Sequence, residues 1–441
     1  MQADRRTAVA VALRWGGRWL AGAAELRAHP TQAAVTTEAF LTRFGLAVVS
    51  LALPLFALSL GMAAHEVGLM YALRTATTVM IKPVMAWAAD RFGRRQTLLL
   101  AVVVRCLVGF LFIFASAPWH LFAIRILAGV TSAARDPSAT ALLATHSTKG
   151  KRGTAFAWYH TARDLGRAVG FAATGFVIQF SGNYRLVFLA AFLSSCASLV
   201  TVARYVRENR DIAERLPVAA TEEFRAEAAS QVAIFKLAPG RALAALRGAW
   251  RRYRRLLDYA GFCAMVASST EMMSTYFPII AIQYAHLAEA QVGLMVSATS
   301  LLGMFGGPFF GWLSDHVSRK VALGTRSVAN TLSSLLYIVA PGFGGFMVAR
   351  LVDETGKAAY RPAWGAMMAE VGDGDPQHRS RTMTFVDTAG TVGETLGPIA
   401  AGLLMSGFGV PVMLGARAAL AIATEIHAIR IFKSRPAEVR A

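Results

Sequence analysis

Long apolar stretches alternate with short polar connections along nearly the whole chain. Each stretch holds about twenty residues, which lets a helix cross a hydrocarbon core of roughly 30 Å. The stretches lack the period-two alternation of membrane β-strands, and a helix satisfies its own backbone hydrogen bonds inside lipid. The pattern predicts an all-α membrane protein with twelve transmembrane helices, near 44–62, 67–88, 97–116, 119–145, 153–180, 185–204, 257–285, 290–314, 320–340, 344–370, 382–406 and 411–432.

The composition agrees with a membrane protein. Hydrophobic residues make up 55% of the chain and charged residues 16%, whereas soluble domains carry roughly a quarter charged residues. The net charge of +19 is high enough to suggest nucleic acid, but most Lys and Arg fall in alternate connections, as the positive-inside rule predicts for cytoplasmic loops. We therefore expect a lipid bilayer and no nucleic acid as partner, a location in the bacterial inner membrane or a membrane derived from it, and both termini in the cytoplasm.

One long connection divides six predicted helices from six. Its end interleaves arginines with Leu243, Leu246 and Trp250, a pattern typical of a helix lying on anionic lipid; a solvated basic linker is the alternative. The expected organisation is an N-terminal amphipathic segment (1–43), a six-helix half (44–204), a linker with an amphipathic helix (205–256), a second six-helix half (257–432) and a cytoplasmic tail (433–441).

The two halves repeat each other in sequence. An offset of 225 residues places Gly68 on Gly293, Asp90 on Asp315 and Arg125 on Arg350. Beyond the fourth inner loop the offset becomes 227. A parallel repeat of six helices predicts a pseudo-two-fold axis along the membrane normal, with the substrate site between the halves.

A charged motif follows the second predicted helix and again the eighth. The first copy contains Asp90, Arg91, Gly93, Arg94 and Arg95; the second contains Gly311, Asp315, Arg319 and Lys320. Glycine supplies the backbone freedom that a tight turn needs, and the charges can form bonds that break and re-form as the halves move. The alternative is that these charges only anchor the topology.

This motif closely resembles the cytoplasmic loop signature of the major facilitator superfamily, Gly-x-x-x-Asp-Arg-x-Gly-Arg-Arg, and the resemblance extends from about residue 40. It implies alternating-access transport without enzymatic activity or cofactor, and it gives Asp90, Asp315 and the neighbouring cations the role of an inner gate. Ala86 departs from the signature at its first glycine. A second, fainter resemblance, carried by Ala134–Ser138 and Ala162–Gly166, is to the permeases of magnetosome gene clusters and implies iron supply.

Charged residues inside the predicted helices are the main candidates for the transport site. They are Arg125 and Asp136 in the fourth helix, and Arg350, Asp353, Glu354, Lys357 and Arg361 in the tenth. Intramembrane charges cost several kcal/mol unless they face a cavity or a partner, so their default interpretation is functional. The alternative for the tenth helix is a neutralised internal network. On the helical face formed by Arg350, Glu354, Lys357 and Arg361, with Asp353 beside it, two cations remain uncompensated, which favours an anionic or metal-chelate substrate.

Glu271 is the acidic residue of the seventh predicted helix and has no basic neighbour in sequence. An acid in a membrane cavity can exchange protons near neutrality, so Glu271 is the candidate for proton coupling. Its alternative is a static ion pair with Arg125 or Arg350.

Glycines recur at a spacing that lets helices approach closely; they are Gly166, Gly170, Gly393 and Gly397. They resemble the Gly-Pro motif of drug/proton antiporters, but Phe171 occupies the proline position, which counts against a drug exporter. We find no metal-ligand spacing and no phosphate-binding loop. The expected function is proton- or gradient-coupled secondary transport of a small molecule or ion by a monomer. Drug or metabolite efflux, a lipid flippase and a non-transporting sensor are the alternatives.

Overall fold

The computed structural model describes residues 29–147, 152–206, 256–316, 319–373 and 379–433. These residues form twelve long helices and no strand, so the predicted fold class is confirmed. The first six are α2 (Pro30–Ser59), α3 (Ala64–Phe92), α4 (Arg94–Phe114), α5 (Pro118–His146), α6 (Arg152–Ser181) and α7 (Tyr184–Tyr205). The others are α11 (Leu257–Ile279), which continues into the π-helical turn η2 (Ile280–Tyr284), α12 (Glu289–His316), α13 (Arg319–Val339), α14 (Phe343–Asp373), α15 (Arg379–Phe408) and α16 (Val410–Lys433).

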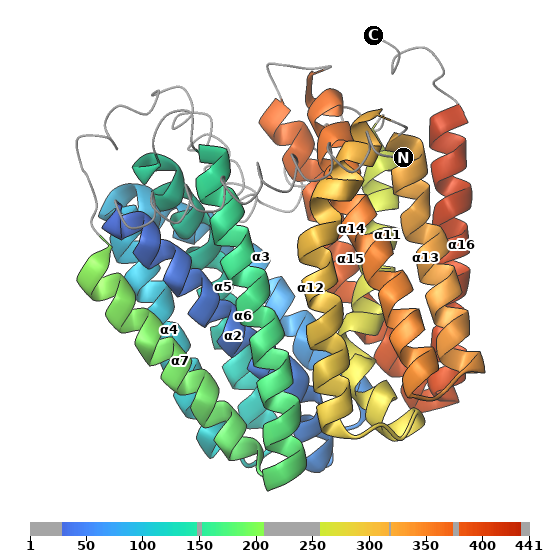
Figure 1. Cartoon of the computed structure of the whole chain (residues 1–441), viewed down its shortest axis with the longest axis horizontal. Helices are drawn as coiled ribbons and strands as arrows, with labels where there is room; N and C mark the ends of the chain where they lie inside the picture. Colours follow the sequence, from blue (N-terminus) through green and yellow to red (C-terminus); the bar gives the residue numbers. More distant parts are fainter. Residues whose placement is uncertain (1–28, 148–151, 207–255, 317–318, 374–378, 434–441) are drawn as a thin grey trace, which may run out of the picture.

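The helices form two bundles side by side (Figure 1). One bundle contains α2–α7 and the other α11–α16. Because successive helices run in opposite directions, Pro30, Tyr205, Leu257 and Lys433 all lie at one end of the molecule, which we call the terminal end. The short connections after α2, α6, α11/η2 and α15 lie at the opposite end. The bundles meet where α6 packs on α12 and α3 packs on α15.

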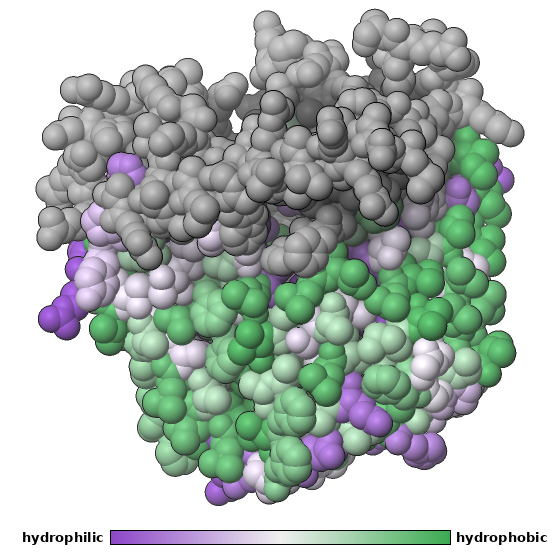
Figure 2. Space-filling view, in the orientation of Figure 1, coloured by the Kyte–Doolittle hydropathy of each residue, from purple (hydrophilic) through white to green (hydrophobic). Residues whose placement is uncertain are grey.

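The outer surface carries apolar stripes that suit contact with lipid. On α4, Leu100, Val103, Leu107, Phe110 and Phe114 are exposed at helical spacing. Figure 2 shows apolar residues over much of the visible face, with hydrophilic residues along its lower edge. By length and composition alone, four of the described helices are apolar enough to cross a membrane: α2, α4, α7 and α16. Others, such as α14, carry buried charges that lower their hydropathy.

The first helix starts earlier than predicted. α2 begins at Pro30, with proline in its first turn, rather than near residue 44. Proline suits this position because its missing N–H is not needed there. Glu38 and Thr42 interrupt the apolar pattern, but both are buried and bonded to arginines of neighbouring helices, so they do not end the helix. The proposed amphipathic segments within 1–28 and 207–255 lie outside the described residues.

Glycines allow close packing inside each bundle. Gly166 and Gly170 of α6 lie directly against the backbone of Phe40 and Phe44 in α2. In the other bundle, α15 packs on α11 through Gly393 and Gly397 in the same way. A side chain at any of the four would collide with backbone atoms of the partner helix.

The bundles touch closely near the opposite end. A side chain at Gly68 of α3 would collide with the carbonyl of Pro398 in α15, and Gly402 lies against the backbone of Ala64. The hydroxyl of Tyr276 donates to the carbonyls of Ala64 and Pro398, over 2.8 and 3.0 Å. This contact therefore joins α3 of one bundle to α11 and α15 of the other.

A second contact repeats the first around the pseudo-two-fold axis. Gly293 of α12 lies against the carbonyl of Phe171, and Gly175 of α6 lies against the carbonyl of Glu289. The offsets of 225 and 227 residues relate Gly293 to Gly68 and Gly175 to Gly402. We call these four glycines the seal. Their symmetric contacts show that the sequence repeat is also a repeat in three dimensions.

Candidate functional site

The region between the bundles centres on Glu271, which lies midway along α11 and η2. Its side chain is half-buried. The charges of Lys357, Arg74 and Arg125, and that of Glu394, act on its carboxylate. Within the described residues, no hydrogen bond or ion pair within 4.0 Å fixes this carboxylate, so it is neither paired with Arg125 nor with Arg350. It remains available to a proton or a ligand.

Arg125 faces this region from α5. Its side chain is buried, and its guanidinium carbon lies 4.2 Å from the centroid of the Tyr71 ring on α3. The close approach of α5 to α3 depends on Gly129, where a side chain would collide with Thr77 and the backbone of Arg74. The Nε and Nη2 atoms of Arg125 find no hydrogen-bond partner among the described residues.

Arg350, the repeat counterpart of Arg125, has a similar environment in the other bundle. It is buried, and its guanidinium carbon lies 4.4 Å from the Phe277 ring centroid. It forms an ion pair of 3.2 Å with Glu354, while its Nε and Nη1 atoms lack partners within the described part of the chain. Both repeat-related arginines therefore keep unused donors.

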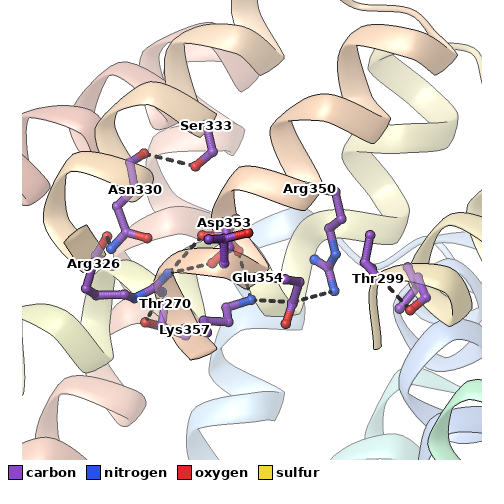
Figure 3. A network of polar contacts seen from close by, with 12 residues as sticks. Thr270, Thr299, Arg326, Asn330, Ser333, Arg350, Asp353, Glu354 and Lys357 are labelled. Atoms are coloured by element: carbon purple, nitrogen blue, oxygen red, sulfur yellow. Dashed lines mark hydrogen bonds and ion pairs between the residues drawn. The ribbon is translucent and has the colours of Figure 1, made fainter. Parts of the chain in front are cut away.

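The charges of α14 form a network, which Figure 3 shows. Lys357 Nζ lies 2.8 Å from Asp353 and 2.8 Å from Glu354. The predicted helical spacing therefore brings Arg350, Glu354 and Lys357 together along one helix. Arg361 belongs to the same helix, but its side chain lies outside the described part of the structure.

Asp353 is the centre of this network, although its position in sequence suggested only a neighbouring role. It is fully buried and binds Arg326 of α13 at 3.1 Å and Arg417 of α16 at 2.7 Å. The network contains two carboxylates, those of Asp353 and Glu354, and four cations, which are Arg326, Arg350, Lys357 and Arg417. The alternative of a neutralised internal network therefore describes Asp353 well. The network as a whole still has more cations than carboxylates.

Arg326 and Arg417 were missed by the sequence reasoning. Arg417 is fully buried and also donates to the carbonyl of Ser269, to the side chain of Asn330 and to the hydroxyl of Ser334. The only signal in the sequence is an isolated arginine within an apolar helix. Its many partners identify it as a structural residue.

Asp136 belongs to a separate network in the first bundle. It pairs with Arg135 at 2.6 Å and lies 4.0 Å from Arg43. Arg135 also binds the buried Glu38 through two bonds, of 3.1 and 2.5 Å. Glu38 was missed as well, because it lies in the segment predicted to precede the first helix. The structure does not bring Asp136 to Glu271.

The first copy of the charged loop motif forms the turn between α3 and α4. Gly93 has a φ of 98°, a conformation that favours glycine. Arg95 donates to the carbonyls of Val206 and Ala203 at the end of α7, at 2.6 and 3.0 Å. Arg91 lies over the ring of Trp87 at 5.4 Å. These contacts stay within one bundle.

Other members of the two motifs are placed less completely. Arg94 opens α4. α12 ends at His316, one residue after Asp315, and α13 begins with Arg319 and Lys320. The side chains of Asp90, Asp315, Arg319 and Lys320 and the surroundings of Gly311 lie outside the described part of the structure. The gate assignment therefore stays a prediction.

No cluster of three or more His, Cys, Asp or Glu residues that could hold a metal ion occurs within the described ranges. The three cysteines are free. The site around Glu271 consists of buried charges and aromatic rings that both helical bundles contribute.

Comparisons with known proteins place this geometry in a family. The sequence model of the Major Facilitator Superfamily matches residues 38–323 and 257–440. A multi-drug resistance efflux pump PmrA homolog of Lactococcus lactis is 22% identical over 355 residues, which are 79% of this chain and 81% of that protein. The class B tetracycline resistance protein of Escherichia coli is 31% identical over 153 residues, but these cover only 34% of this chain and 38% of that protein.

Solved structures share the fold. A bacterial homolog of the human lysosomal transporter Spinster aligns with a TM-score of 0.73 at 14% identity, over 92% of this chain and 97% of that one. The nucleoside transporter NupG aligns with a TM-score of 0.73 at 11% identity, over 91% of this chain and 100% of that one. The chain belongs to the Major Facilitator Superfamily of membrane transporters.

Proposed function

We propose that this protein is a proton-coupled secondary transporter that moves a small solute with an anionic group, or an anionic metal chelate such as one of iron, between its two bundles. The observation that carries the proposal is the position of Glu271. It is a half-buried acid between the bundles, near cations from both of them, and no hydrogen bond or ion pair within the described residues fixes it.

Proton coupling needs a group that changes its charge as the molecule changes its conformation. Glu271 of α11 lies in the bundle opposite to that of Arg74 and Arg125. Movement of the bundles would therefore change the cationic environment of its carboxylate. An alternating-access cycle would require the two bundles to approach each other at the terminal end and to separate at the seal, with substrate bound near the midplane.

The anionic preference rests on the cations that line the same region. Arg125 and Arg350 each keep buried donor atoms without partners, and the network around Asp353 has more cations than carboxylates. An anionic group would offset this charge and satisfy these donors. A metal ion would enter as its chelate, bound through the anionic groups of the chelator.

The test compares cells that lack the gene with cells that carry the wild type or Glu271→Gln. Untargeted mass spectrometry and elemental analysis would follow the small molecules and metals inside them. We expect an anionic solute or chelate to change in the deletion, to recover with the wild type and not to recover with Glu271→Gln. Full recovery with Glu271→Gln would contradict the coupling assignment, and a change confined to lipophilic cations would contradict the anionic class.

Drug/proton antiport is the second candidate, because the relatives at 22% identity over most of the chain are named multi-drug efflux pumps. Its test is growth of overexpressing cells on lipophilic cationic drugs. We expect unchanged inhibitory concentrations, since a cationic cavity repels such drugs. A several-fold rise that Glu271→Gln abolishes would favour efflux over the anionic solute.

A further inference from the structure

A cavity with a largely apolar wall and a few charged and hydroxyl groups lies inside the first bundle, between α2, α3, α4, α5 and α7. Its volume is about 50 Å³, and it is partly open to the exterior. Three arginines line it, Arg74, Arg105 and Arg125, together with the hydroxyl residues Thr131, Ser132 and Ser195. No acidic residue lines this cavity within the described part of the chain. Its walls therefore suit an anion.

The arginines keep donors for such an anion. Arg125 is 6% exposed and leaves Nε and Nη2 without partners. Arg105 is 8% exposed; it donates to Thr42 but leaves Nε unpartnered. Arg74 is held by a bond of 2.9 Å to Ser132. Buried guanidinium donors without partners are costly, and their planar forks match the oxygen atoms of carboxylate and phosphate.

The nearest carboxylate does not neutralise these charges. Glu38 lies 3.9 Å from Arg105, but it forms its short bonds, of 3.1 and 2.5 Å, with Arg135. Arg74 and Arg125 have no ion pair to an acidic residue within the described ranges. The cavity thus keeps a net positive charge from two arginines, and Arg105 adds a partly compensated third.

The second bundle differs from the first at the position that corresponds to Arg105. The repeat aligns Arg105 with Asn330, and Asn330 accepts a bond from Arg417 at 3.0 Å. The same arginine is neutralised by Asp353. At the repeat position of Arg417 the first bundle has Ala190, next to Ala191 of the cavity wall. The groups that line the cavity are therefore not repeated at these positions of the second bundle.

We propose that this cavity is an oxyanion site, in which Arg74, Arg105 and Arg125 bind one carboxylate or phosphate group of the transported solute. The proposal rests on the proposed function and assigns its anionic end to the first bundle. It predicts asymmetric recognition: Arg74, Arg105 and Arg125 of the first bundle bind the anionic group, while Asp353 of the second bundle stabilises the fold.

The site also connects anion binding to Glu271. The groups that act on its carboxylate are Arg74 of α3, Arg125 of α5, Lys357 of α14 and Glu394 of α15, and the nearby Tyr71 of α3. A bound anion would compete with Glu271 for the charges of Arg74 and Arg125. Anion binding and protonation of Glu271 should therefore favour each other, since such linkage is reciprocal.

The test uses the purified full chain in detergent, with sodium phosphate and sodium acetate as probes and sodium chloride at equal ionic strength as reference. We expect phosphate or acetate to raise the thermal midpoint saturably in the wild type. Arg125→Gln removes a donor, and Val49→Phe fills the cavity without changing its charge. Both variants should still elute as folded protein, and both should raise the half-saturating concentration at least tenfold. Arg185→Gln, at an exposed arginine outside the cavity, should leave this concentration within twofold.

Three results would overturn the site. They are a wild type without a saturable response, a response that Arg125→Gln and Val49→Phe leave unchanged, and a response seen only with phosphatidylglycerol in nanodiscs and not with free phosphate or acetate. The last would identify a lipid headgroup as the ligand. None of these results bears on the pH-gradient dependence of Glu271→Gln, so the site and the proposed function can fail separately.

Discussion

At the scale of single residues, Asp353 illustrates how a buried charge can stabilise this fold. It receives Arg326, Arg417 and Lys357 from three helices while it is itself fully buried. Removing one partner from such a group leaves the others buried and uncompensated, which costs about 3–5 kcal/mol. The residue therefore acts mainly on stability, in contrast to Glu271.

We predict that Asp353→Asn lowers the free energy of unfolding by about 3–5 kcal/mol. Thermal unfolding of the purified protein in detergent would measure the loss as a lower midpoint. Thr355→Ala, an exposed position on the same helix, is the matched control and should leave the midpoint unchanged. Equal midpoints for Asp353→Asn and the wild type would contradict the structural role.

The sequence predicted ion pairs within one helix better than ion pairs between different helices. Arg350, Glu354 and Lys357 follow helical spacing, so their pairing along α14 was expected. Arg326, Arg417 and Glu38 find partners that lie far away in sequence. Periodicity carries no information about which helices pack together, and a single sequence provides no other source for it.

At the scale of helices, the charged loop motif is partly a capping device. Arg95 holds the last carbonyls of α7, and charge-assisted bonds of this kind contribute about 1.5–3 kcal/mol. This binds the end of α7 to the start of α4 inside one bundle. Any gate function of the motif would then depend on its other residues.

Arg95→Ala should therefore loosen the end of α7. The amide of Val206, which donates to Val202, should exchange at least tenfold faster in hydrogen-exchange mass spectrometry. Arg91→Ala, which removes a contact with the exposed Trp87, should leave that exchange unchanged. Equal exchange in both variants would show that Arg95 does not cap α7.

The helices themselves were largely predictable, because each apolar stretch carries its own length signal. The start of α2 was not. Its first turns contain Thr36, Glu38 and Thr42, which read as polar in sequence but are buried in the structure. Their bonds to side chains of other helices or to their own backbone appear only once the bundle is assembled.

At the scale of the whole molecule, the seal links the repeat to the conformational cycle. Its glycines allow two symmetric contacts between the bundles at the opposite end. A transporter that alternates access must break these contacts to open at this end. The small residues let the bundles meet closely without fixing them through ion pairs.

Gly68→Leu should open the seal, since its side chain cannot fit against Pro398 and Tyr276. In a cysteine-free background, spin labels at Ser59 and Phe408 would report the separation of the bundles. We expect a longer distance distribution than in the parent, and an unchanged one for Gly365→Leu, where a side chain meets open space. A distribution equal to that of the parent would contradict the role of the seal.

The most direct test of proton coupling through Glu271 measures proton movement in proteoliposomes. A gradient of the anionic solute found in the cell comparison would be imposed, and a trapped dye would follow the internal pH. We predict that the solute gradient drives protons in the wild type and in Asp258→Asn, an exposed acid on the same helix, but not in Glu271→Gln. Proton movement of equal size in Glu271→Gln would contradict coupling through this carboxylate.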